Sequence, residues 1–94
     1  MFKKMDNKNR NVLKATILKK LKRRGKWGGA HTSLDKLTAG IPKHLCREAK
    51  DAAKELIKEG LLLSKPTSYG LEVSLNPRRR DKIERIIHEY LGEE

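Results

Sequence analysis

A run of basic residues with helical spacing is the feature of this sequence that most directly suggests chemistry. Five cations follow one another at intervals of three or four positions: Lys43, Arg47, Lys50, Lys54 and Lys58. On a helix such intervals place side chains on one side, so the five predict a single basic stripe. The apolar residues of the same segment fall on another side: Leu45, Ala49, Ala52, Ala53 and Leu56. A helix of this kind can pack on a domain and enter the major groove of DNA.

The N-terminal end of that helix carries the residues that we expect to approach base edges. These are Lys43, His44 and Arg47. Arg47 is the best candidate for reading guanine, because the planar guanidinium matches the two acceptors of guanine in the major groove. The alternative is a solvated charged face, in which the stripe pairs with neighbouring acids: Glu48, Asp51 and Glu55.

Two smaller polar groups are candidates to extend a nucleic-acid surface. Three consecutive cations open the last predicted helix: Arg78, Arg79 and Arg80. The helix dipole disfavours cations at that end, and a bound phosphate would offset the cost, although a tolerated surface run is an equal alternative. The turn between two predicted strands offers Lys65, Ser68 and Tyr69. Tyr69 would either contact nucleic acid or cover the apolar face of its own hairpin.

Most of the positive charge lies in the first third of the chain. The 94 residues carry a formal net charge of +11, and residues 1–31 contain eleven Lys or Arg against one acid. Such a field suits a polyanion, since each phosphate contact releases a condensed counterion. The candidate phosphate contacts in this part are Lys3, Lys4, Lys8, Arg10, Lys22, Arg23, Arg24 and Lys26. The same charge would also suit RNA, or would serve solubility alone.

The apolar periodicity predicts one domain over 7–91, preceded by a flexible basic arm at 1–6 and followed by a frayed tail at 92–94. Four helices are predicted, at 7–24, 33–39, 43–59 and 77–91. The first carries an apolar stripe built on Leu13, Ile17 and Leu21.

Turn and capping residues separate these helices from three short strands. Strands are expected at 30–31, 61–64 and 71–75, the last two forming a hairpin around the turn 65–70. Thr32 and Asp35 fit a capping box for the second helix, and Gly60 ends the third. Asn76 followed by Pro77 predicts the start of the last helix. The fold class is therefore α+β.

This order of elements resembles the winged helix-turn-helix superfamily, including small archaeal members. The stretch SLDKLTAGIPKHL looks like the second helix, the tight turn and the entry to a recognition helix. The stretches KELIKEGLLLSK and SYGLEVSLNP look like the end of that helix and the two strands of a wing. The resemblance covers about 7–91 and implies a three-helix core, a wing of two or three strands and a C-terminal helix. It also implies DNA binding through the third helix and the wing. The recognition helix is predicted to be about one turn longer than is typical.

Signals for an enzyme, a cofactor or a metal site are weak. Gly25-Lys26 lacks the spacing of a phosphate loop, and no CxxC or HxxxH pair offers metal ligands. The single cysteine, Cys46, is expected at the edge of the core, and Trp27 is expected to pack over it. We expect no enzymatic activity, no cofactor and no ligand pocket in so small a core. No segment predicts a leader peptide or a membrane span, so a cytoplasmic location is expected, and the absence of Gln leans toward a thermophilic source.

The leading functional hypothesis is a double-stranded DNA-binding regulator or architectural protein. An RNA-binding winged helix is a second hypothesis, although the sequence offers few aromatic platforms for stacked bases. A protein-interaction module without nucleic acid is a third. A homodimer through the last helix, 77–91, is possible, but packing of that helix on the first helix is slightly favoured.

Overall fold

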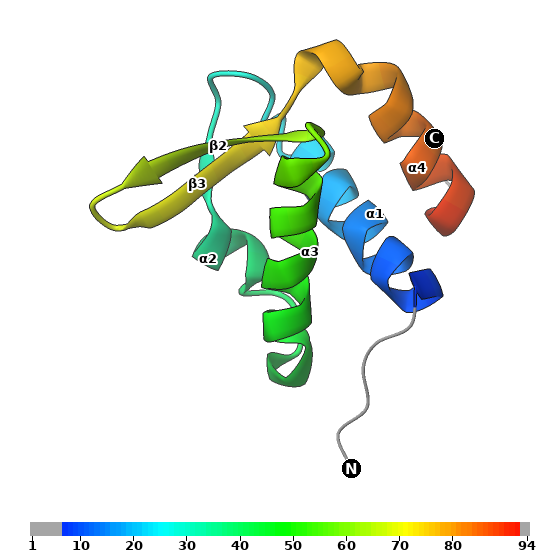
Figure 1. Cartoon of the computed structure of the whole chain (residues 1–94), viewed down its shortest axis with the longest axis horizontal. Coiled ribbons are helices and arrows are strands. Elements are labelled where there is room, and N and C mark those ends of the chain that lie inside the picture. The colour runs from blue at the N-terminus through cyan, green and yellow to red at the C-terminus, as the bar shows by residue number, and fades with distance from the viewer. Residues whose placement is uncertain (1–6, 93–94) are drawn as a thin grey trace.

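Residues 7–92 of the computed structural model form an α+β domain of helices beside a three-stranded antiparallel sheet (Figure 1). The α-helices are α1 (Asn7–Arg23), α2 (Leu34–Thr38), α3 (Cys46–Lys58) and α4 (Arg80–Leu91). The strands are β1 (Thr32–Ser33), β2 (Leu62–Thr67) and β3 (Gly70–Leu75). Two 3₁₀ turns, Lys43–Leu45 and Pro77–Arg79, lead into α3 and α4. The predicted fold class is confirmed at this level.

The core lies where α1 meets the other elements. Ile17 and Leu21 of α1 are fully buried, as the stripe predicted, and they join Leu56 of α3, Ile87 of α4 and Leu75 of β3 in one apolar cluster. Each such side chain contributes about 1.5–3 kcal/mol when it leaves water. Trp27 is partly buried and packs against this cluster, as expected.

The sheet is longer than predicted and its first strand is displaced. Its order is β1-β3-β2, with Thr32 opposite Val73 and Thr67 opposite Gly70. The strand predicted at 30–31 therefore lies two residues later, because the backbone N–H of Ala30 is used in a turn, where it donates to Trp27 O. The hairpin strands were predicted to stop at 64 and to resume at 71, but pairing continues to Thr67 and Gly70.

Two local features extend the hairpin. Pro66 is tolerated in β2 because this strand lies at the edge of the sheet, where the missing N–H costs no ladder bond. At the tip, Thr67 Oγ1 donates to Gly70 O at 2.8 Å and accepts from Tyr69 N at 3.2 Å. Gly70 has φ +130°, a backbone conformation that residues with a side chain rarely adopt. The turn thus contains Ser68 and Tyr69 alone, and Lys65 lies in a strand.

The starts of two helices also differ from the prediction. Ser33 caps α2 by accepting from Lys36 N at 3.1 Å, because Thr32 is held in the sheet opposite Val73. The segment before α3 opens as a 3₁₀ turn in which Leu45 N donates to Pro42 O. Regular α-helix begins only at Cys46, so the extra turn predicted for this helix is not α-helical.

Asn76 provides a cap as predicted, but the segment opens as the 3₁₀ turn Pro77–Arg79, and regular α-helix begins only at Arg80. The last helix, α4, packs on α1. Asn76 Oδ1 accepts from Arg78 N at 3.1 Å, and Asn11 of α1 donates to Tyr90 Oη at 3.2 Å. The apolar residues Ile83 and Ile87 are buried. In the part of the chain that the structure describes, the exposed large apolar side chains are Leu63 and Tyr69, and neither is on α4. The apolar stripe of α4 is thus buried at Ile83 and Ile87 and partly buried at Ile86 and Leu91, and a homodimer through 77–91 stays an untested prediction.

No helix within residues 7–92 is both long and apolar enough to cross a membrane.

Candidate nucleic-acid interface

The exposed side of α3 and of the 3₁₀ turn before it gathers the predicted basic stripe. A hollow of about 550 Å³ is lined by Lys43, Cys46, Arg47, Lys50, Asp51 and Lys54. Lys43, Arg47 and Lys54 are exposed, as is His44 beside them. Lys58 is also exposed but lies further along the helix, outside the hollow. The structure thus brings together four of the five cations of the stripe.

Lys50 differs from the other cations of the hollow because it already has a partner. Its Nζ lies 3.3 Å from Asp35 Oδ1 of α2, with half of the lysine side chain still exposed. Such exposed pairs contribute little to stability, so a phosphate could replace Asp35 at small cost.

Two acids at the C-terminal end of α3 and directly after it, Glu55 and Glu59, pair with α1 and not with the basic stripe. Glu55 forms one ion pair with Arg10 of α1 and a second with Lys14, whose Nζ is 3.0 Å from Glu55 Oε1. Glu59 Oε2 lies 2.9 Å from the same Nζ. For Glu55 the alternative of pairing with the stripe is not what the structure has, since its partners come from α1. Asp51 is the one carboxylate among the described residues that line the hollow.

The same contacts shift two pKa values. The hydrogen bond from Lys14 is the largest cause that holds the pKa of Glu55 below its ordinary value; burial opposes it, and the charges of Lys14 and Arg10 add to it. Burial works to lower the pKa of Lys14, but hydrogen bonds and attraction from Glu59 and Glu55 outweigh it and leave that pKa raised. Both shifts favour the charged pair, so these acids stay engaged with α1.

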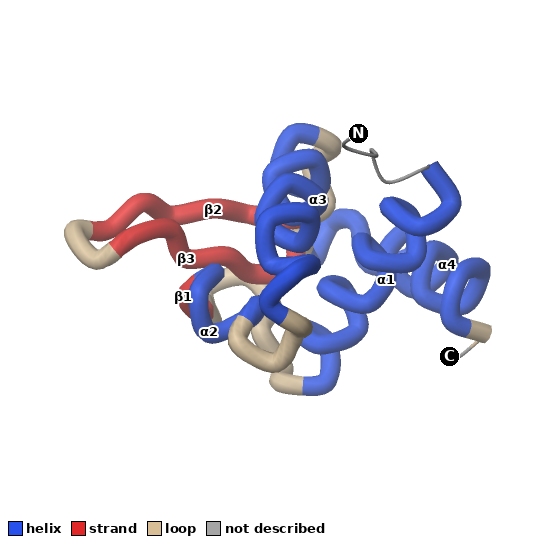
Figure 2. Tube along the Cα trace, turned by 90° about the horizontal axis from the view of Figure 1, so that it is seen from below, coloured by secondary structure: helices blue, strands red, loops and turns tan. Residues whose placement is uncertain are grey.

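The β2–β3 hairpin projects from the C-terminal side of α3, away from α4 (Figures 1 and 2). Tyr69 at its tip is 96% exposed, so it does not cover the apolar face of its own hairpin. Ser68 beside it and Lys65 in β2 are also exposed. Lys65 lies opposite Glu72 of β3, whose negative charge partly offsets the charge of the lysine. The tip therefore offers a ring and a hydroxyl to an external partner.

The three arginines before α4 lie at the other end of α3 from Lys43. Arg79 is next to Gly60, which ends α3, and α3 is about 20 Å long at 1.5 Å per residue. Arg80 stacks on Trp27 with its guanidinium 4.5 Å from the ring centroid. Arg78 and Arg79 are exposed. The run thus forms a separate patch and does not extend the N-terminal end of the stripe.

The cations of α1 are divided between internal pairs and solvent. Arg10 pairs with Glu55, and Lys22 donates to Glu84 of α4 at 2.5 Å. Arg23 and Arg24 are exposed at the end of the helix, and Lys26 is half-buried. Lys3 and Lys4 lie outside the described residues, as does the side chain of Lys8.

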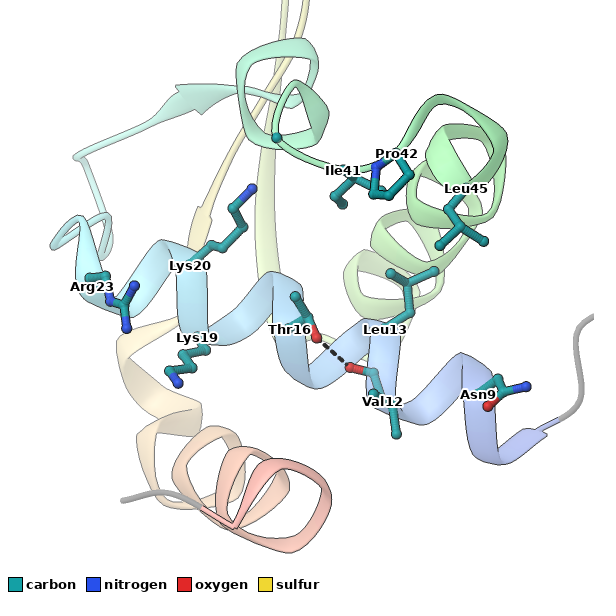
Figure 3. A pocket seen from close by; sticks show the side chains of 11 residues that line it. Asn9, Val12, Leu13, Thr16, Lys19, Lys20, Arg23, Ile41, Pro42 and Leu45 are labelled. Carbon is teal, nitrogen blue, oxygen red and sulfur yellow. Dashed lines mark hydrogen bonds between the residues drawn. The ribbon is translucent and has the colours of Figure 1, made fainter.

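A groove that the sequence did not predict runs between α1 and the segment that joins α2 to α3 (Figure 3). Its volume is about 670 Å³, whereas the sequence shows no obvious sign of a pocket. Ile41 and Pro42 form part of one wall, although neither belongs to the apolar stripe of a helix. That pair of apolar residues directly after a helix-ending glycine was the one signal in the sequence for this groove.

Comparison with protein-family models, with curated proteins and with solved structures finds no match. Within the described residues, no group of three or more His, Cys, Asp or Glu side chains is arranged to hold a metal ion. The geometry of the surface is therefore the basis for inferring a function.

Proposed function

We propose that this protein is a winged helix-turn-helix protein that binds double-stranded DNA, as a transcriptional regulator or a DNA-architectural factor. Its order of elements supports this assignment, since a short helix and a turn precede α3 and a projecting hairpin follows it. In this mode α3 enters the major groove, and the hairpin contacts the backbone or the minor groove.

The observation that carries the proposal is the division of charge on α3. Glu55 and Glu59 point to Lys14 of α1, while Arg47 and Lys54 face solvent. Because Glu55 and Glu59 pair with α1, Asp51 is the one described carboxylate in the hollow, beside four cations, and this face of α3 is net positive. Solvated charged faces usually mix both signs, so this separation favours an anionic partner.

Each cation has a different role in the proposed complex. Lys43, His44 and Arg47 lie at the end of α3 that approaches base edges in proteins of this type. Arg47 donates two hydrogen bonds to guanine, while Lys50 and Lys54 contact phosphates, which gives affinity without sequence choice. Arg23, Arg24, Lys26, Arg78 and Arg79 contribute to long-range attraction. Arg10 is left out of the interface because Glu55 neutralises it.

Fluorescence anisotropy with a labelled duplex tests this proposal. We expect Arg47→Glu and Lys54→Glu each to weaken binding about tenfold or more, because each removes a favourable contact and adds a repulsive one. Lys82→Glu makes the same charge change at an exposed position of α4 and should alter affinity by about twofold or less.

Two results would contradict the proposal. Equal losses in all three variants would indicate attraction by net charge alone. Stronger competition by structured RNA than by unlabelled duplex, at the same salt concentration, would favour RNA as the partner.

A further inference from the structure

The groove between α1 and the α2–α3 connection has the size and lining of a small-molecule site. Its volume of about 670 Å³ falls within the range of about 300–1,000 Å³ that such sites occupy. Leu13 of α1 points across the groove toward Leu45, and Ile41 and Pro42 lie beside Leu45 on the opposite wall (Figure 3). A ligand with an apolar body would therefore contact apolar side chains on both sides.

Cations gather at one end of this groove. Lys20 and Arg23, which are three positions apart on α1, lie at the end away from Asn9 (Figure 3). Of the eleven described residues that line the groove, three are Lys or Arg and none is Asp or Glu. The charge of this end is thus not offset within the lining, which favours an anionic group in the ligand.

The position of the Lys20 ammonium is fixed by the turn opposite it. Its Nζ donates to Leu37 O at 3.2 Å, which leaves two of its three N–H donors for other acceptors. A Cβ on Gly40 would lie 2.9 Å from this Nζ, so the glycine lets the ammonium approach the turn closely. Lys20 is therefore held at the groove by backbone groups, while Arg23 is exposed beside it.

We propose that this groove binds a free monocarboxylate with a long apolar body. The carboxylate accepts hydrogen bonds from Lys20 and Arg23, and the apolar body lies between Leu13 on α1 and the opposite wall at Ile41 and Leu45. None of the residues that line the groove belongs to the hollow on α3, although Arg23 also contributes to the proposed long-range attraction of DNA. The site can therefore be tested without nucleic acid.

Amide chemical-shift titration with dodecanoate, kept below its micelle concentration, tests the site on the full chain. We expect saturable shifts confined to 12–23 and 40–45. Dodecanol should bind about tenfold more weakly because it lacks the charge, and acetate more weakly still because it lacks the apolar body.

Variants then separate the groove from general attraction. Arg23→Glu should weaken dodecanoate binding about tenfold, whereas Arg24→Glu, an exposed neighbour outside the lining, should change it by about twofold or less. Thr16→Phe should block binding by filling the groove, with a cooperative thermal transition showing that the domain still folds.

Three outcomes would overturn the proposal. Equal losses in Arg23→Glu and Arg24→Glu would mean that the ligand follows net charge alone. Equal binding of dodecanol and dodecanoate would mean that the cations do not recognise the carboxylate. Shifts of the groove on dilution of the protein alone, together with dimers in sedimentation velocity, would assign the groove to a second copy of the chain.

Discussion

Lys14 of α1 lies between Glu55 of α3 and Glu59, the residue directly after that helix, at 3.0 Å and 2.9 Å. The lysine side chain is 11% exposed, whereas both glutamates remain nearly half exposed. This contact fastens α3 to α1 and turns its acids away from the exposed basic face. The packing of two helices and the charge of the candidate interface therefore depend on the same residues.

Glu55→Gln is expected to destabilise the domain by about 1 kcal/mol, because Arg10 and Lys14 both lose a charged partner in a partly buried position. Asp51→Asn removes a carboxylate from the same helix at an exposed position, and its effect should stay within about 0.5 kcal/mol. Urea unfolding of both variants measures the difference. Similar midpoints for the two would show that the contact between α1 and α3 does not depend on Glu55.

Acid should remove the contribution of Glu55. Because its pKa in the folded protein is lowered from 4.5, the stabilisation is complete above that pH and is lost as the pH falls further. The raised pKa of Lys14 matters at alkaline pH. Its stabilisation is complete below pH 10.5 and is lost as the pH rises further. Thermal midpoints should therefore fall more steeply below pH 4.5 in the wild type than in Glu55→Gln. Parallel curves would contradict this assignment.

Asp35→Asn should strengthen DNA binding while leaving stability nearly unchanged. The pair between Asp35 and Lys50 is exposed, at 3.3 Å, and such pairs contribute at most about 1 kcal/mol. Release of Lys50 adds up to one phosphate contact, so the plot of log affinity against log salt should steepen by up to about 0.9. Glu89→Gln, an exposed acid of α4, is the matched control. An equal change of slope in that control would show that net charge alone is responsible.

Arg80→Ala should lower the unfolding free energy by about 0.5–1 kcal/mol, because the guanidinium stacks on a partly buried ring. Trp27 is the single tryptophan of the chain, so its fluorescence reports on this contact directly. Arg78→Ala, at an exposed position in the same run, should change neither the emission maximum nor the stability. An unchanged emission spectrum in Arg80→Ala would argue against the stacking.

Local patterns were enough to predict most elements of this fold. The stripe of Leu13, Ile17 and Leu21 gave the buried face of α1, because its spacing follows the helical period. The side chain of Asn76 caps the 3₁₀ turn that leads into α4, and Gly60 follows the end of α3 with φ +80°, so both act on backbone groups close to them in sequence. These features depend on neighbours in sequence, which is why sequence alone predicted them.

The features that were missed depend on contacts between distant segments. The pattern of its own helix offered Glu55 only the neighbouring cations as partners, but its partner Lys14 is 41 positions earlier in the chain. The groove lies between α1 and the segment around Ile41. The spacing of these two segments depends on tertiary packing, so a repeat of apolar residues within one helix does not predict it. The sequence does not decide whether Tyr69 covers the apolar face of its hairpin, because that depends on how far the hairpin projects from the domain.

The most direct test of the central claim is an amide chemical-shift titration with a duplex of about 20 base pairs, close to two helical turns, at about 0.15 M salt. The proposed complex predicts shifts over 43–54 and 65–70, which combine the exposed face of α3 with the hairpin. Shifts that scatter over the end of α1 and vanish with modest added salt would contradict the insertion of α3 into the major groove.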